Sequence, residues 1–260
     1  MANKAIKLSR ARVLISNDDG INAPGLKALE GIMQKLAVEV WVVAPETEQS
    51  AASHSLTLRI PLRIRNLSQH RYAINGTPTD CVLLGIKEIM KEAPPDLVVS
   101  GINRGGNMGE DVTYSGTVAA AMEGTLLGVP SVALSQLQKD GHPVKWGTAE
   151  KWVAKVMKKL TKEAWPKGVL MNVNFPNVLA AKVTGIEITR QGQRKIGSDL
   201  VRGEDPRGEP YYWIGAQRRE QHYGPGTDLE ALSRGAVSVT PLTMNLTHGP
   251  TLKKLKARFK

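Results

Sequence analysis

Cysteine and long apolar runs are both scarce in this chain of 260 residues. Cys81 is the only cysteine, which excludes an internal disulfide and a metal site built from several thiolates. No stretch of 18 or more apolar residues occurs, which argues against a helix that spans a membrane. The first ten residues lack the apolar segment of a signal peptide. We therefore expect a cytoplasmic protein that does not enter a membrane.

Acidic residues are also in short supply, because 35 lysines and arginines face 24 aspartates and glutamates and the formal net charge is +11. Such an excess attracts polyanions and phosphate-bearing small molecules. Charge alone does not separate a nucleic-acid-binding protein from an enzyme that acts on nucleotides. The basic segments lack a pattern of interleaved aromatic residues along one strand or helix, which makes nucleic acid the less favoured partner.

Short apolar strands and amphipathic helices alternate through most of the chain. We expect strands at 13–16, 38–44, 96–100, 129–134 and 169–175, and helices near 23–36, 79–90, 116–127 and 150–162. Strands separated by helices imply right-handed crossovers and a mostly parallel sheet. The predicted fold is therefore α/β, with a three-layer α/β/α Rossmann-like core over residues 1–180.

Two segments depart from this alternation. Residues 55–75 are expected to form three short antiparallel strands, at 56–58, 62–64 and 72–74, with Asn75-Gly76 as a closing turn. Residues 181–260 are expected to form a β-rich C-terminal arm and tail that pack on the core. Arms of this kind often exchange between protomers.

Two adjacent carboxylates, Asp18 and Asp19, follow the first predicted strand directly. Neighbouring anionic side chains repel each other unless one is protonated or a cation lies between them. Hard cations such as Mg²⁺ and Mn²⁺ prefer oxygen ligands of this kind. Asn, Asp and Gly are also common in surface turns, so a turn is the competing interpretation.

Polar residues follow other strands at the same predicted edge of the sheet, where α/β folds bind ligands. A hydroxyl-rich loop contains Ser50, and a glycine-rich stretch contains Asn103 and Asn107. Ser115 and Thr117 then stand at the start of a helix, where hydroxyls cap free backbone amides. The glycine-rich stretch does not match a P-loop, because no Gly-Lys-Ser/Thr follows it. The chain does not match a dinucleotide fingerprint either, because Asp18-Asp19 occupies the first turn, which argues against a nicotinamide-dependent oxidoreductase.

Several motifs occur together in a fixed order. They are Ser16-Asn17-Asp18-Asp19-Gly20, residues 45–57 with Ser50, Gly76-Thr77-Pro78-Thr79-Asp80, residues 100–107 from Ser100-Gly101-Ile102-Asn103 to Asn107, and residues 114–124 beginning Tyr114-Ser115-Gly116-Thr117. In this combination the chain resembles the SurE survival-protein nucleotidases. A weaker match through Asp205-Pro206-Arg207-Gly208, Tyr212-Trp213-Ile214-Gly215 and Gly226-Thr227-Asp228 extends the resemblance over nearly the whole chain.

The resemblance implies a phosphatase, of the 5′-nucleotidase type, that hydrolyses nucleoside 5′- and 3′-monophosphates and, in some members, short polyphosphate. It implies one divalent metal ion per subunit, Mg²⁺ or Mn²⁺, with Ca²⁺ a further candidate, and a homodimer or homotetramer formed through the arm. The implied metal ligands are Asp18, Asp19, Ser50 and Asn103. The implied catalytic residues are Asp18, Asp19 and Asn107, and the implied phosphate-side groups are Asn107, Ser115, Gly116 and Thr117.

The chain departs from the family pattern at two positions. Asn22 stands where many relatives have histidine, and Ala51 stands where glycine is frequent after Ser50. A Cβ atom at position 51 can restrict the approach of the backbone to phosphate, but it does not prevent the Ser50 hydroxyl from binding a metal.

Some roles stay open at this stage. His54 can donate to phosphate or protonate a leaving group, but a packing role is favoured. Tyr114, or aromatic residues of the arm, can stack on a base, although interface packing is favoured for the arm. The alternative function is a basic nucleic-acid or stress-response binding protein whose acidic site is not catalytic.

Overall fold

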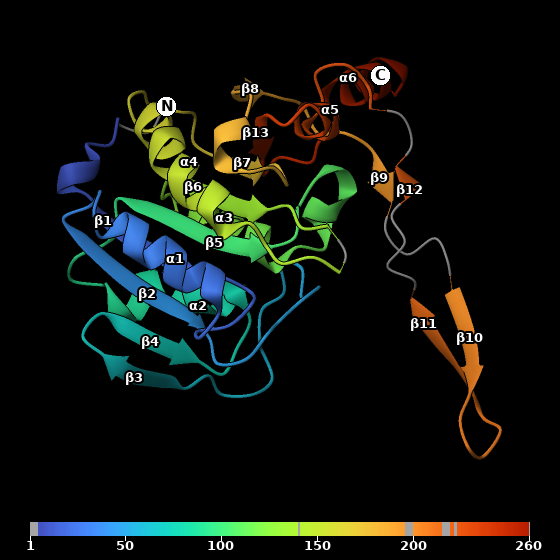
Figure 1. Ribbon diagram of the computed structural model, residues 1–260, viewed down its shortest axis with the longest axis horizontal. Helices are drawn as coiled ribbons and strands as arrows, with labels where there is room; N and C mark the ends of the chain where they lie inside the picture. The colour runs from blue at the N-terminus through green and yellow to red at the C-terminus, as the bar shows by residue number, and fades with distance from the viewer. Residues whose placement is uncertain (1–4, 140, 196–199, 215–218, 221–222, 260) are drawn as a thin grey trace.

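A mixed sheet forms the centre of the computed structural model, which describes residues 5–139, 141–195, 200–214, 219–220 and 223–259 (Figure 1). Within these residues the sheet has nine strands in the order β3-β4-β2-β1-β5-β6-β7-β13-β8. The six strands from β4 to β7 in this order are all parallel to one another. They are β4 (Arg71–Ile74), β2 (Glu39–Pro45), β1 (Arg12–Ser16), β5 (Leu97–Arg104), β6 (Ser131–Gln136) and β7 (Val169–Phe175).

Helices cover both faces of this sheet. Val13 and Ile15 of β1 pack in one apolar cluster with α1 and α4, whereas Leu14 packs in a second cluster with α2. Successive side chains of a strand point to opposite faces, so this partition places a helical layer on each side. The predicted three-layer α/β/α class is confirmed. The helices are α1 (Pro24–Met33), α2 (Pro78–Leu84), α3 (Gly116–Leu126) and α4 (Trp146–Leu160), with short helical turns η1 (Leu8–Arg10), η2 (Gly85–Ile89), η3 (Gly109–Thr113) and η4 (Ala180–Lys182).

The prediction for residues 55–75 is partly wrong. Residues 56–58 form no strand, because the Thr57 N–H donates to the Asp80 carboxylate at 3.0 Å rather than to a neighbouring strand. The first strand of this region is β3 (Ile64–Ser68), which pairs antiparallel with β4 around a turn at His70, whose φ is +59°. Asn75-Gly76 does not close a hairpin, since β4 pairs parallel with β2 and the chain then enters α2.

The segment after residue 180 contributes to two different parts of the molecule. Strand β13 (Val237–Thr243) pairs antiparallel with β7 in the large sheet, and β8 (Ile186–Ile188) lies beside it. Strands β10 (Leu200–Glu204) and β11 (Pro210–Ile214) form a separate hairpin that projects away from the core (Figure 1). The remaining elements are β9 (Arg194–Lys195), β12 (Arg219–Glu220), α5 (Asp228–Ser233) and the exposed basic helix α6 (Gly249–Arg258).

Among the described residues, no helix is both long and apolar enough to cross a membrane.

Candidate metal and phosphate site

A cavity of about 220 Å³ opens at the carboxyl edge of the sheet, where β1, β2 and β5 end. Open α/β sheets bind ligands at this edge. Its walls carry most of the residues that the sequence singled out, together with others that it did not. The lining residues are Asp18, Asp19, Glu48, Ser50, Ala51, Asn103, Arg104, Asn107, Asp111, Tyr114 and Ser115.

Asp18 lies two residues beyond the end of β1 and its side chain is buried. The Thr117 hydroxyl, at the start of α3, donates a hydrogen bond to the Asp18 carboxylate. Burial raises the pKa of Asp18 because the charged form loses hydration, and the hydrogen bond from Thr117 opposes that shift. Thr117 therefore orients a carboxylate of the cavity.

Asp19 accepts a hydrogen bond from the backbone N–H of Arg104 at 3.2 Å, which joins the end of β1 to the end of β5. Burial and the neighbouring charge of Asp18 raise the pKa of Asp19 to about 6, while the N–H and the charge of Arg104 act in the opposite direction. The two carboxylates both have raised pKa values, and a cation between them would favour their charged forms.

The donor set around these carboxylates fits a hard divalent cation. The Asn103 amide nitrogen donates to the Gly105 carbonyl at 2.8 Å, so the amide oxygen is the end of that side chain that is available to a cation. The Ser50 hydroxyl lines the same cavity and donates to Glu48 at 2.6 Å. No group of three or more His, Cys, Asp or Glu side chains suited to a metal occurs among the described residues, so neutral oxygens would have to complete the coordination.

Asn107 is held in place by polar side chains from two buried strands. Its side-chain nitrogen donates to the Ser135 hydroxyl at 2.9 Å, and its backbone N–H donates to the Asn174 oxygen at 2.8 Å. Its carbonyl accepts from the amides of Asn172 and Asn174 at 2.8 and 3.0 Å. A buried hydrogen-bond network of this kind is rigid, so Asn107 is presented to the cavity in one orientation.

The start of α3 forms another wall of the site. Ser115 caps the helix by accepting from the Val118 N–H at 3.0 Å, and it lines the cavity. Gly116 and Thr117 do not line the cavity. A Cβ atom at Gly116 would lie 2.8 Å from the Asp18 Cβ atom, so the glycine allows α3 to approach Asp18 closely.

The hydroxyl-rich loop is tied down at several points. The Gln49 N–H donates to the Asp18 carbonyl at 2.8 Å, and the Ser53 hydroxyl donates to the Thr113 carbonyl at 2.7 Å. Thr77 forms a capping box with Asp80 on α2, and the Thr77 hydroxyl also donates to the Ser55 carbonyl at 2.7 Å. The motif that contains these residues thus anchors the loop that carries Ser50.

Two residues of the same loop gain a physical interpretation from their geometry. Ala51 has a φ of +60°, a left-handed conformation that glycine adopts at lower cost, which gives a reason for glycine at this position in related chains. The His54 Nε2 atom lies 3.0 Å from the carboxylate of Glu123 on α3, so its ring is engaged in a partly buried pair. Asn22, the other departure from the family pattern, is exposed.

Residues after position 180 hold in place the turn η3, which follows the glycine-rich stretch. The Asp228 carboxylate accepts from the backbone N–H groups of Gly109, Gly192 and Leu229 at 3.0, 2.8 and 2.9 Å. Arg194 forms a buried ion pair with Asp111, which lines the cavity. Burial raises the pKa of Asp228, and the three N–H groups and Arg194 oppose this shift.

Sequence reasoning missed Glu48, Arg104 and Asp111 as members of the cavity. Arg104 and Glu48 lie inside segments that the motifs had already marked, so their charge was a signal that could have been used. The buried Asn172 and Asn174 had a signal too, since they alternate within an otherwise apolar strand. The pairing of Asp111 with Arg194 joins positions 83 residues apart and has no local signal.

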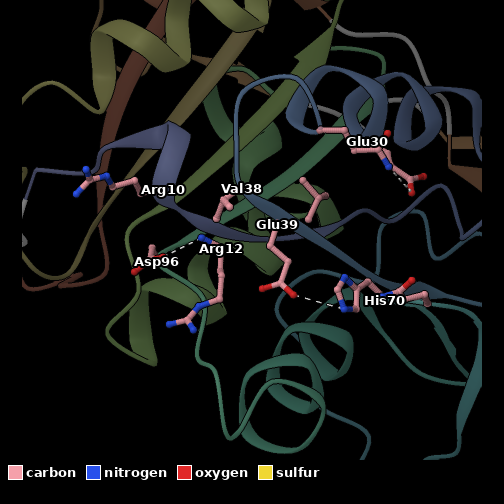
Figure 2. A pocket seen from close by; sticks show the side chains of 10 residues that line it. Arg10, Arg12, Glu30, Val38, Glu39, His70 and Asp96 are labelled. Carbon is pink, nitrogen blue, oxygen red and sulfur yellow. Dashed lines mark hydrogen bonds and ion pairs between the residues drawn. The ribbon is translucent and has the colours of Figure 1, made fainter.

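A larger cavity, of about 910 Å³, lies at the opposite edge of the sheet (Figure 2). Its acidic groups already have partners: Glu39 lies 3.4 Å from the ring nitrogen of His70, and Asp96 accepts from the Arg12 N–H at 2.8 Å. It contains no adjacent pair of carboxylates. The smaller cavity is therefore the better candidate for metal and phosphate chemistry.

Comparison with known proteins places this geometry in a family. The family described as Survival protein SurE matches residues 13–198. A 5′-nucleotidase SurE from Paramagnetospirillum magneticum is 63% identical over 96% of this chain and 96% of its own length, and one from Parvibaculum lavamentivorans is 55% identical over 94% and 89%. The crystal structure of the SurE protein from Aquifex aeolicus superposes with a TM-score of 0.84 at 42% identity, covering 96% of this chain and all of that one.

Proposed function

The chain belongs to the SurE family, and we propose that it is a nucleotidase whose cavity around Asp18 and Asp19 hydrolyses nucleoside 5′- and 3′-monophosphates to nucleoside and phosphate. The observation that carries the proposal is the pair of adjacent carboxylates with raised pKa values in a cavity that the neutral oxygen-bearing side chains of Ser50, Asn103 and Asn107 also line. Short-chain polyphosphate is a further substrate in this proposal, because its terminal group presents the same oxygens.

Asp18, Asp19, Ser50 and Asn103 would hold one divalent cation per subunit, Mg²⁺ or Mn²⁺. All four line the cavity and offer oxygen atoms, the ligands that these ions prefer. When bound, such a cation supplies a water of lowered pKa and partly neutralises phosphoryl charge.

The residues of the chain itself would orient the reactants. Asn107 is fixed by its buried network and can donate to a phosphoryl oxygen with the second hydrogen of its amide. Asp18, held by Thr117, and Asp19, held by the Arg104 N–H, can each accept a proton of the attacking water. Donors that are already oriented stabilise the charge that builds up on the phosphoryl group without reorganising.

The surroundings of the cavity suggest how the rest of a nucleotide and a second subunit would be accommodated. The Tyr114 ring is 42% exposed at the cavity and can stack on a base.

The projecting hairpin β10–β11 would join subunits into a homodimer or homotetramer. A cytoplasmic location agrees with a single reduced cysteine and with a nucleotide substrate.

Phosphate release from a panel of 5′- and 3′-nucleotides and polyphosphate tests this proposal. We expect turnover with Mn²⁺ or Mg²⁺ and loss of turnover in EDTA, because the carboxylate pair cannot replace the charge of the cation. Absence of release with every divalent metal would contradict it. Such a result would favour the alternative, a basic binding protein, for which nucleic-acid affinity should fall steeply with salt.

A further inference from the structure

We propose that the guanidinium of Arg104 binds the phosphoryl group of the substrate and makes the cavity selective for dianionic phosphate. This proposal rests on the proposed nucleotidase function. Arg104 is the last residue of β5 and lines the cavity beside Asp19 and Asn103.

The balance of charge in the cavity requires a further cation. Asp18, Asp19 and Glu48 bring three negative charges, while the charge of Asp111 is offset by its ion pair with Arg194. A divalent cation offsets two of the three charges, so one negative charge would still face an incoming phosphate dianion. Among the described residues that line this cavity, Arg104 is the one cationic side chain, and its charge completes the balance.

The backbone of Arg104 is anchored while its side chain is not. Its N–H donates to Asp19 at 3.2 Å, and the next N–H, of Gly105, donates to the Gln136 carbonyl at 2.9 Å on β6. The side chain is exposed, and within the described parts of the chain no hydrogen bond or ion pair engages its guanidinium. Its positive charge nevertheless acts on Asp19, whose pKa it lowers, so it lies within electrostatic range of the carboxylate pair.

These features suit a phosphate-binding arginine. A guanidinium presents several N–H donors in a planar fork that matches two phosphate oxygens, whereas an ammonium acts as a point charge.

A structural alternative is that Arg104 only offsets the charge of Asp19. In that case its loss would change metal binding and leave phosphate binding unchanged once the metal site is saturated.

The test compares R104Q and R104K with wild type, with R10Q as the matched control. Arg10 is also an exposed arginine, but it lines the cavity at the opposite edge of the sheet (Figure 2). The measurements are kcat and KM for 5′-AMP, and Ki for inorganic phosphate, at saturating Mn²⁺. Calorimetry adds the Kd of phosphate for the Mn²⁺-loaded proteins and the Kd of Mn²⁺ alone.

For R104Q we expect KM, Ki and the phosphate Kd to rise together by roughly 10- to 100-fold, the range of a lost charge-assisted hydrogen bond. The Mn²⁺ affinity should stay the same or increase, because a neighbouring cation has been removed. R104K should lie between R104Q and wild type, since it restores the charge without the fork. R10Q should match wild type.

Two results would overturn the role of Arg104. One is a phosphate Ki and Kd for R104Q within about twofold of wild type, a difference too small for a direct charged contact. The other is weaker Mn²⁺ binding by R104Q with phosphate affinity unchanged at saturating metal. A wild-type protein that releases no phosphate would instead contradict the nucleotidase function, while calorimetry would still report whether Arg104 binds phosphate.

Discussion

Asp18 and Asp19 are adjacent in the chain, but different partners hold them. Thr117 donates to Asp18 from the start of α3, and the Arg104 N–H donates to Asp19 from the end of β5. Each contact favours the charged carboxylate against the burial that disfavours it. The pair therefore remains available to a cation at a cost in the stability of the metal-free protein.

Replacing Asp19 with asparagine should separate the effect of its charge on cation binding from the effect of its charge on stability. The amide keeps an oxygen that can accept from the Arg104 N–H, but it lacks the charge that attracts a cation. We expect turnover to fall by more than about 100-fold and Mn²⁺ affinity to fall with it. In EDTA at pH 8 the Tm should equal or exceed that of wild type, since the raised pKa of Asp19 shows that its ionised form destabilises the fold. Wild-type turnover with an unchanged metal requirement would rule out Asp19 as a ligand.

Metal affinity should depend on pH because protons compete for the same carboxylates. Asp19 has a pKa of about 6 in the metal-free protein, and the pKa of Asp18 is raised as well. As the pH falls below about 6, protonated Asp19 must release its proton before it binds a cation, so the Kd of Mn²⁺ should rise roughly tenfold per pH unit. Calorimetry from pH 5 to 8 measures this slope. Asp19→Asn should show a shallower dependence, and equal wild-type affinity at pH 5 and pH 8 would contradict the assignment.

At the scale of single residues, the sequence predicted those that follow a strand and missed those that meet through the fold. Asp18, Asp19, Asn103 and Asn107 were found because parallel strands bring their carboxyl ends to one edge of the sheet. Thr117 was predicted to face phosphate, yet its hydroxyl donates to a carboxylate 99 residues away in the chain. Such a contact depends on the close approach of the start of α3 to the loop that follows β1, which no local pattern reports. The ligand and phosphate roles of these residues stay predictions.

Helix α3 is the element that sets the position of Asp18, and Gly116 makes that position possible. In Gly116→Ala the new Cβ atom would lie 2.8 Å from the Asp18 Cβ atom and 3.1 Å from its carboxylate oxygen. We expect α3 to shift, at a cost of about 1–3 kcal/mol in the free energy of unfolding, with Mn²⁺ affinity and kcat reduced. Denaturant unfolding and metal titration measure the two effects.

Gly31→Ala provides the control for this substitution. Gly31 lies within α1, and a Cβ atom there would have no heavy atom within 4 Å apart from its chain neighbours and the backbone of its own helix. Alanine should therefore stabilise the fold by about 0.5–1 kcal/mol and leave metal binding unchanged. If Gly116→Ala behaves like Gly31→Ala, the proposed close packing of α3 against Asp18 is wrong.

At the scale of elements, strands were predicted correctly where their apolar residues are buried. They were predicted wrongly where apolar residues alternate with polar ones in a loop at the surface. Strand β7 has the predicted bounds, 169–175, because its apolar residues are buried between helical layers. Leu56 and Leu58 alternate with polar residues as in a strand, but they are 46% and 85% exposed and the loop is tied to Asp80 instead. Strand β5 continues beyond Ser100 to Arg104 because it resumes pairing with β6 after an irregularity.

For the molecule as a whole, the segment after residue 180 has two separable tasks. One part completes the large sheet through β13. It also holds the turn η3, which contains Gly109 and Asp111, through Asp228 and Arg194. The other part, the hairpin β10–β11, projects from the core (Figure 1). Its large apolar side chains are exposed to solvent. In the proposed assembly this exposed apolar surface forms the subunit interface, so stability and assembly should respond to different substitutions.

Loss of the hairpin should therefore change assembly but not chemistry. We expect wild type to have a light-scattering mass of two or four times 28.2 kDa. Replacing residues 200–214 with a short Gly-Ser linker should give a smaller particle, because the exposed side chains of Tyr212, Trp213 and Ile214 would no longer cover a partner. Phosphate release per subunit should persist, since every residue that lines the cavity lies between Asp18 and Ser115.

Point substitutions make this prediction sharper. Trp213 is 69% exposed on the hairpin, and Leu246 is 93% exposed outside it. Trp213→Glu should lower the mass towards that of one subunit, because a charge buried at an apolar interface is costly to desolvate. Leu246→Glu should leave the mass unchanged, since both variants add the same charge and only one adds it to the hairpin. A wild-type mass of 28.2 kDa, or an unaltered oligomer after loss of the hairpin, would show that this surface does not join subunits.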